Sequence, residues 1–446
     1  MHDTNNPPLA HAGNPDALLS RELGTRQLAA TIFNYTVGSG IFVLPAFAVL
    51  QLGSAAPLAY VACAIIIGLV VMCFAEAGSR VSATGGPYAY VETALGPMWG
   101  FVAGCLVVAT GTSAAAGVCN VLARSILTLA PGVSIWANRF VILVLVAALV
   151  SINYRGVKTG ARVIEAITVA KLLPLLAFVG IGVFFIEPSN LVWTHIPDTS
   201  MVLGTAGIVI FAFSGIEGSL IPSGEVKNPS KTVPRAAFLA LGAATLLYLA
   251  IQFVALGILG TALAEDRTTP LASAADAVIG PTGRTILVVG AVISMFGYLS
   301  ANILSEPRGL FAMSRDRFLP AILMSVHPSF HTPHKAIVIY GVIVASIALS
   351  GTYETLTIFA NLSALMLYFL CAIAAYVLRK KDVRADGEPF LAPGGPLVPV
   401  AACLSLAWLF YETVTTEQFF ALVIVLVVVF VMYGLRTWRL KAQQPA

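Results

Sequence analysis

The stretch TVGSGIF, residues 36–42, lies in the middle of an apolar segment that extends from residue 27 to residue 50. A segment of this length can cross a bilayer, which takes roughly 20 apolar residues. Glycine disfavours a helix by about 1 kcal/mol relative to alanine. Gly38 and Gly40, on either side of Ser39, therefore predict a helix that breaks at mid-membrane. Because lipid cannot bind the exposed backbone N–H and C=O groups, we expect a polar group to occupy the break.

Composition indicates an integral membrane protein. The 446 residues are 58% hydrophobic and only 10% charged, with a mean hydropathy of +0.89, whereas soluble domains carry about 25% charged residues. Residues 1–22 are polar and lack the basic region and short apolar core of a signal peptide, so we expect a cytosolic tail. The six cysteines are scattered without a C-x-x-C pair, which gives no support to a metal site or a disulfide.

About twelve apolar runs have the length of a membrane span. They cover residues 27–50, 55–79, 97–129, 136–153, 162–186, 201–222, 234–262, 284–312, 336–351, 354–378, 397–413 and 418–437. With both termini in the cytosol, most of the 25 lysines and arginines fall in cytosolic loops, as the positive-inside rule requires. The net charge of +4 is explained by these loops and calls for no nucleic-acid partner.

The interruption of the first run has an echo in the sixth. Residues 211–218 read FAFSGIEG, which again places Ser-Gly-Ile at mid-membrane. Interrupted helices at corresponding positions of two halves point to an inverted-repeat transporter and to its binding site. Glycine is common in membrane helices, so coincidence remains the alternative for this three-residue match.

Two such breaks would offer complementary binding groups. The half-helix that starts near Ser39 and Gly40 presents free N–H groups and a positive dipole end, which suit a carboxylate. The half-helix that ends at residues 211–214 presents free C=O groups, which suit an ammonium. Together they describe a site for a zwitterion. The alternative is that the glycines only allow close helix packing, and spacing alone does not decide between the two.

Lys171 is a basic residue inside a predicted span. An intramembrane ionisable group is a functional candidate because it costs at least about 2.5 kcal/mol, and an amine removed from water gives up its proton more easily. Its position near the start of the run leaves the alternative that it extends to the cytosolic interface. Glu217, beside the second break, is either a proton carrier, a substrate contact or a structural acid. Glu306 is expected nearer a cytosolic end, where it could pair with Arg308.

Other motifs favour no enzymatic or metal chemistry. His327, His331 and His334 are separated by Pro328 and Pro333, which prevent one continuous helix, so a solvated loop is the expectation. The sequence has no phosphate-binding G-x-x-x-x-G-K-[ST], no H-E-x-x-H and no G-x-S-x-G, so ATP-driven pumping and the commoner hydrolase reactions have no support.

Several motifs in order along the chain resemble the amino acid-polyamine-organocation superfamily of permeases, and within it the bacterial amino acid transporters. They are GSGIFVLP at residues 38–45, EAGSR at 76–80 with GGPYAY at 85–90, FSGIE at 213–217 with GEVKNP at 224–229, and FAMSRD at 311–316. This resemblance implies an all-α, leucine-transporter-like core at residues 23–380 with inverted halves at 23–187 and 198–380. Helices one and six would be broken. A cytosolic loop at 381–395, two additional spans at 396–438 and a cytosolic tail at 439–446 would follow.

The resemblance also implies which residues bind substrate. The carboxylate would be held at Ser39 and Gly40 beside Gly38, and the amine by carbonyls of the two breaks. An aromatic gate would cover the substrate, and helix eight would contribute an amide side chain. The carbonyls would be those of Thr36, Phe211 and Ser214, with Gly215 also in the binding site. The gate would be the ring of Phe211, and the amide that of Asn302.

Lys171 resembles the helix-five lysine of proton-coupled members, with Gly38 and Ser305 as neighbours. The sequence therefore predicts a secondary active transporter of amino acids in the bacterial inner membrane, a proton-coupled symporter that works by alternating access. Sodium is less favoured than the proton, no cofactor is expected, and the partners are the amino acid and the surrounding lipid. Two alternatives remain, an amino acid exchanger and a transport-inactive amino acid sensor.

Overall fold

The computed structural model describes residues 23–128, 135–155, 157–193, 196–385 and 387–442, and their regular structure is helical apart from a single β-bridge between Leu23 and Val226. The predicted cytosolic tail at residues 1–22 lies outside the described residues. The helices are α1 Thr25–Thr36, α2 Gly40–Leu52, α3 Pro57–Arg80, α4 Pro87–Leu95, α5 Pro97–Thr128, α6 Ile135–Tyr154, α7 Val157–Gly182, α8 Thr199–Phe213, α9 Ile216–Ser219, α10 Pro229–Leu259, α11 Pro270–Arg315, α12 His334–Ser350, α13 Tyr353–Lys380, α14 Leu397–Thr413 and α15 Thr416–Ala442.

Both predicted interruptions are present. The first apolar run forms α1 and α2, whose axes differ by 46° across the break at residues 37–39. The sixth run forms α8 and the short α9, separated by Ser214 and Gly215. Gly215 has φ +134°, a backbone conformation that residues with a Cβ rarely adopt. The break therefore depends on glycine at this position.

Within the described residues, nine helices are long and apolar enough to cross a membrane, and ten if the bent pair α1 and α2 is one span. α12 and α14 are apolar but shorter. The run predicted at residues 284–312 belongs to the longer α11, which carries non-helical backbone angles at Ile279 and Gly280. The nine-residue α4 was not predicted as a helix, because it is too short to give a spanning run.

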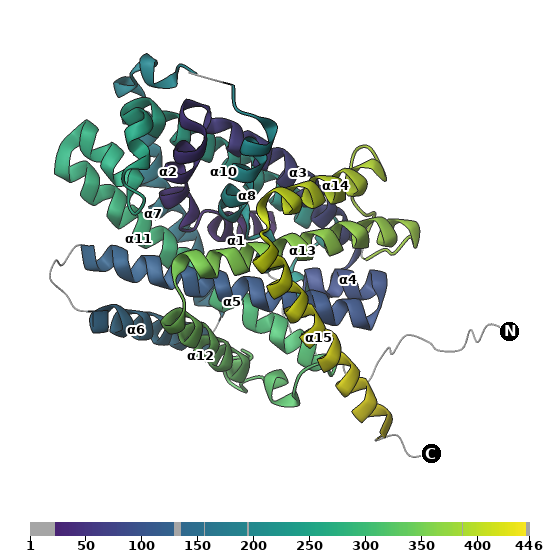
Figure 1. The fold of residues 1–446 in the computed structure, drawn as a ribbon. Helices are drawn as coiled ribbons and strands as arrows, with labels where there is room; N and C mark the ends of the chain where they lie inside the picture. The colour runs from purple at the N-terminus through teal and green to yellow at the C-terminus, as the bar shows by residue number, and fades with distance from the viewer. Residues whose placement is uncertain (1–22, 129–134, 156, 194–195, 386, 443–446) are drawn as a thin grey trace.

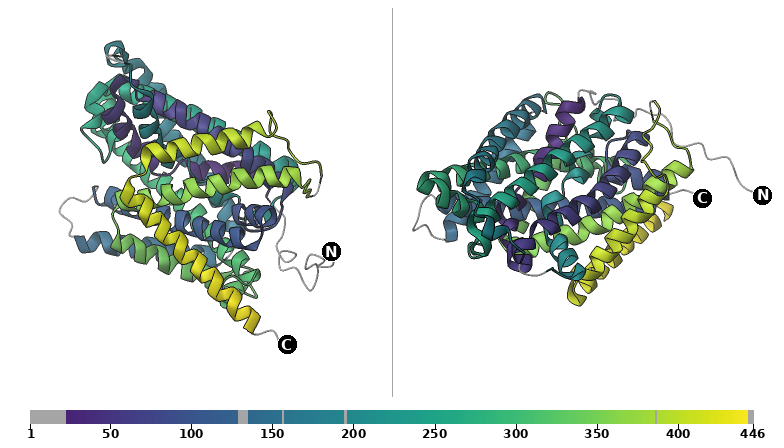
Figure 2. Two further views of the ribbon diagram at one scale, coloured as in Figure 1. Left: turned by 45° about the vertical axis from the view of Figure 1, so that its right-hand side comes forward. Right: turned by 90° about the horizontal axis from the view of Figure 1, so that it is seen from above.

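The helices form a bundle with α5 and α13 packed side by side through its middle (Figure 1). In the most apolar stretch of α5, 78% of residues are buried within the protein, against 11% in α15. Figure 2 shows α15, in yellow, along the outside of the bundle. α15 is therefore a peripheral helix with a surface suited to lipid, whereas α5 belongs to the core that surrounds the two breaks.

Candidate functional site

The two helix breaks contact each other directly. A Cβ at Gly40 would lie 2.8 Å from the Cα of Ala212 in α8, and a Cβ at Gly215 would lie 2.8 Å from the carbonyl carbon of Tyr35 in α1. Such distances are well below carbon–carbon contact, about 3.5–4.0 Å. Each glycine thus lets one broken helix approach the backbone of the other. The sequence analysis gave close helix packing as the alternative to substrate binding. The two glycines do allow such packing at this site.

A narrow cavity lies at this contact. Its walls come from both breaks and from α5, α11 and α13. The lining residues are Tyr35, Thr36, Gly38, Ser39, Gly40, Thr110, Gly111, Ala114, Val118, Phe211, Ser214, Gly215, Glu217, Tyr298, Glu306 and Ala360. All the predicted substrate-binding residues except Asn302 are among them.

One side of the cavity offers hydrogen-bond donors. The N–H groups of Gly40 and Ile41, the first two of α2, have no preceding helical turn to receive them, whereas that of Phe42 donates to the carbonyl of Ser39 at 3.0 Å. The hydroxyl of Ser39 is buried, and no described residue forms a hydrogen bond with it. The positive end of the α2 dipole points to the same place. This arrangement suits a carboxylate.

The facing side offers a free acceptor. In a continuous helix the N–H of Gly215 would donate to the carbonyl of Phe211, but here it donates to Glu217 Oε2 at 2.9 Å. Glu217 Oε2 also accepts from Tyr368 Oη at 2.8 Å. Glu217 thereby holds the break open and leaves the carbonyl of Phe211 available to an ammonium. The sequence had left this structural role open beside that of a proton carrier.

The carbonyl of Thr36, predicted as a further acceptor, is already engaged. It accepts from Gly38 N–H at 3.0 Å and from Tyr248 Oη at 2.8 Å. The same Tyr248 hydroxyl lies 2.8 Å from the carbonyl of Ala212. Because a carbonyl oxygen has two lone pairs, Thr36 has no free one in this conformation. Tyr248, on α10, instead ties the ends of α1 and α8 together, and no sequence pattern had singled it out.

Lys171 is fully buried and directed at the first break. Its Nζ donates to the carbonyls of Val37 at 2.8 Å and of Asn34 at 3.3 Å. The alternative that it extends to the cytosolic interface is therefore wrong. Val37 also accepts from Ser294 Oγ at 2.9 Å. Gly38 is adjacent as expected, but the serine that shares a carbonyl with Lys171 is Ser294 rather than Ser305, whose hydroxyl has no partner.

The structure does not support substrate contact by Asn302. This residue is buried and does not line the cavity. Its Nδ2 donates to the carbonyl of Gly111 at 3.2 Å, and its Oδ1 accepts from Tyr340 Oη at 2.8 Å. Both ends of the amide are thus used to join α11 to α5 and α12.

The pairing of Glu306 with Arg308, which the sequence left possible, is not formed. Arg308 Nε lies 2.7 Å from Glu225 Oε1. Glu306 instead reaches the cavity, where its Oε2 has no hydrogen-bond partner in the part of the chain that the structure describes. Residues two apart on a helix do not face each other, which is why the two side chains of α11 diverge.

Comparison with known proteins identifies the family. The sequence profile described as amino acid permease matches residues 23–438. The chain belongs to the amino acid permease family. A methylthioribose transporter of Bacillus subtilis (strain 168) is 31% identical over 88% of this permease and 88% of its own length. From the same strain, a branched-chain amino acid permease is 26% identical over 97% of both chains, and a serine/threonine exchanger is 28% identical over 90% of this chain and 92% of its own.

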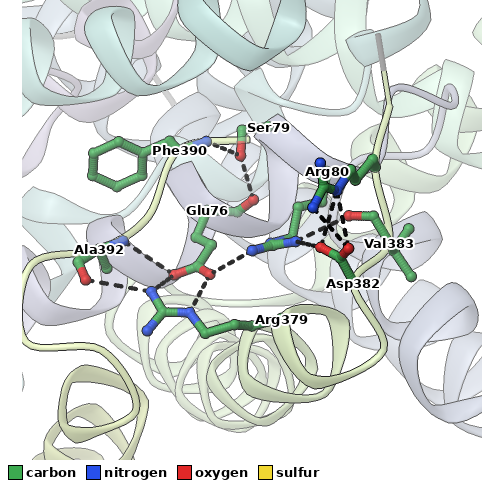
Figure 3. Close-up of polar contacts among 9 residues, drawn as sticks. Glu76, Ser79, Arg80, Arg379, Asp382, Val383, Phe390 and Ala392 are labelled. Carbon is green, nitrogen blue, oxygen red and sulfur yellow. Dashed lines mark hydrogen bonds and ion pairs between the residues drawn. The ribbon is translucent and has the colours of Figure 1, made fainter. Parts of the chain in front are cut away.

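A second buried polar cluster of this permease lies where α3 and α13 end. Figure 3 shows Glu76 between the guanidinium groups of Arg80 and Arg379. Glu76 Oε1 accepts from Arg379 Nε at 2.6 Å and from Arg80 Nη2 at 3.3 Å, and Glu76 Oε2 accepts from the N–H of Ala392 at 3.2 Å. The cluster ties the loop at residues 381–395, which follows α13, to the end of α3.

Proposed function

We propose that this permease is a secondary active transporter that moves amino acids across the bacterial inner membrane by alternating access. The observation that carries the proposal is the facing of two helix breaks across one cavity. Free N–H groups and the Ser39 hydroxyl stand on one side, and the free carbonyl of Phe211 on the other. A zwitterion is complementary to both. Nothing in this arrangement requires a chemical step, so we propose transport and not catalysis.

Helix packing supports the proposed inverted repeat. Suppose that the halves at residues 23–187 and 198–380 correspond. The broken pair α8 and α9 then matches the broken pair α1 and α2. The four helices that follow match in order, α10 with α3, α11 with α5, α12 with α6, and α13 with α7. Helix pairs that pack together in the structure have counterparts that also pack together. α1 packs on α10, and its counterpart α8 packs on α3. In the same way, α5 packs on α13 and α11 on α7, and α1 packs on α9 and α8 on α2. Five spans are an odd number, so the second half would enter from the opposite side of the membrane.

Span number follows from the same division. The ten membrane-compatible helices, with α12 and α14 of 17 residues each, give a proposed total of twelve, since about 17 residues are enough to span. α14 and α15 are then the two additional spans at residues 396–438. The lysines and arginines of the loops favour cytosolic termini.

Lys171 supports proton coupling. An ammonium buried against the carbonyl of Val37 links a titratable group to the break that would hold the substrate carboxylate. We propose that protonation of Lys171 favours one arrangement of the break, so that proton and amino acid move together. Exchange without net proton movement is the second candidate, which the serine/threonine exchanger among the relatives favours.

The test is uptake by purified protein in liposomes. A panel of amino acids, with methylthioribose added because of the related transporter, is offered with and without an inward proton gradient. We expect saturable uptake of at least one amino acid that the gradient accelerates. Uptake only into liposomes preloaded with amino acid would establish exchange, and binding without flux would establish a sensor. Methylthioribose uptake with no amino acid binding would contradict the zwitterion site.

A further inference from the structure

Glu306 is a buried acid that the proposed mechanism does not use. Glu306 is 1% exposed, it lines the cavity from α11, and its Oε2 has no hydrogen-bond partner among the described residues. Room for the carboxyl exists because residue 111 of α5 is glycine. A Cβ at Gly111 would lie 2.7 Å from Glu306 Oε2. The backbone of α5 therefore lies close to this carboxyl.

No cation of the described structure compensates this carboxyl. Arg308 is bound to Glu225, and the Nζ of Lys171 is held by backbone carbonyls of α1 and its break. None of the residues that line the cavity is a lysine, arginine or histidine. The other acid in the cavity, Glu217, has the same sign of charge. A buried ionised carboxyl without a cation is strongly unfavourable, so Glu306 is either protonated or balanced by a cation that the substrate brings.

The position of Glu306 separates it from the carboxylate-binding end. Tyr298, also on α11, lies beside the first break, because a Cβ at Gly38 would lie 3.4 Å from its ring. Glu306 lies eight residues further along the same helix, about 12 Å at helical rise. A substrate held by its α-carboxylate at the first break would therefore extend its side chain toward Glu306. The buried hydroxyl of Tyr35, likewise without a partner, also belongs to this cavity.

We propose that Glu306 selects substrates with a cationic side chain, so that this permease carries basic amino acids such as lysine, arginine or ornithine. The inference rests on the proposed amino acid transport and adds the substrate class. The side-chain cation binds the free oxygen of Glu306, while the α-amino and α-carboxylate groups bind at the two breaks. When Glu306 is ionised, its negative charge balances the positive charge of the substrate side chain inside the protein.

The test compares lysine with norleucine, which has the same carbon chain without the ammonium. Competition binding is measured on the full-length protein in detergent, for the unmodified chain, for Glu306→Gln, and for Glu354→Gln, a matched change of an exposed acid on α13. We expect lysine to bind more tightly than norleucine in the unmodified protein. The ratio of the two affinities should fall at least tenfold in Glu306→Gln and stay unchanged in Glu354→Gln.

Equal or weaker binding of lysine than of norleucine in the unmodified protein would overturn the inference while leaving amino acid transport intact. An unchanged affinity ratio in Glu306→Gln would overturn it as well. The first comparison needs no variant, so the inference stays testable even if Glu306→Gln does not fold. Absence of binding for every amino acid would reject the proposed function itself, together with this inference.

Discussion

Replacing Gly40 by alanine places a methyl group between the two broken helices. The new Cβ would lie 2.8 Å from the Cα of Ala212 and 2.9 Å from its Cβ. Carbon atoms in contact are about 3.5–4.0 Å apart, so α2 and α8 must separate by about 0.7 Å or more. No rotation of a flexible side chain can relieve the contact, because the atoms that are met are a Cα, a Cβ and a backbone nitrogen.

The two consequences of Gly40→Ala differ in size. Overpacking destabilises by about 1–3 kcal/mol, and the better helix propensity of alanine returns up to about 1 kcal/mol, so the protein should still fold. A substrate bond of about 2.9 Å would lengthen to roughly 3.6 Å, which is no longer a hydrogen bond. A hydrogen bond to a charged group contributes about 1.5–3 kcal/mol, so affinity should fall about 10- to 100-fold.

The assay pairs substrate binding with thermal unfolding in detergent, for Gly40→Ala and for a control, Gly68→Ala. Gly68 lies within α3, and a Cβ there would meet nothing within 4 Å. The control should keep both its affinity and its melting temperature. If Gly40→Ala binds and transports substrate like the unmodified protein, the contact between the breaks does not shape the binding site, and the assignment of the cavity is wrong.

Three further predictions follow from single contacts. Lys171→Ala should transport at a rate that no longer changes with pH, measured as uptake across a range of external pH values, and a retained pH dependence would remove Lys171 from the coupling mechanism. Glu76→Gln should lower the free energy of unfolding by about 3–5 kcal/mol, because it leaves two arginines without their buried partner. Thermal unfolding checks this against Asp382→Asn, whose 62%-exposed side chain should leave the melting temperature nearly unchanged. Tyr248→Phe should lower the free energy of unfolding by about 1–3 kcal/mol, because two helix-end carbonyls lose a donor, and it should weaken substrate binding. Tyr411→Phe, at an 81%-exposed position, should change neither thermal unfolding nor substrate binding.

Both helix breaks could be predicted from the sequence because they depend on local chemistry. Gly40 and Gly215 are poor helix formers in segments of spanning length, and such a conflict between local propensity and the expected helix has few explanations other than a break. The unpaired backbone groups of each half-helix then follow from helix geometry. Lys171 could be predicted for a similar reason, since a charged residue in an apolar run needs a partner.

The side chains that surround the breaks could not be predicted in the same way. Tyr248 and Ser294 are ordinary residues in their helices, and their roles arise only when α10 and α11 pack against the first break. Asn302 lies on α11 one turn from Glu306, and of these two residues only Glu306 lines the cavity. Pairing of Glu306 with Arg308, which the sequence had left possible, is prevented by helix geometry, because residues two apart on a helix are about 200° apart around its axis.

The bonds of Lys171 limit how strongly a proton can control the proposed transporter. A hydrogen bond to a charged group contributes about 1.5–3 kcal/mol and a neutral one about 0.5–1.5 kcal/mol. Loss of the proton as pH rises would therefore weaken the hold on the carbonyl of Val37 by about 1–2 kcal/mol. By the relation between free energy and equilibrium, this shifts two arrangements of the break by roughly 5- to 30-fold. Transport should then vary with pH within that range and level off at both ends. A much larger variation would require a second titrating group besides Lys171, for which Glu217 at the other break is a candidate.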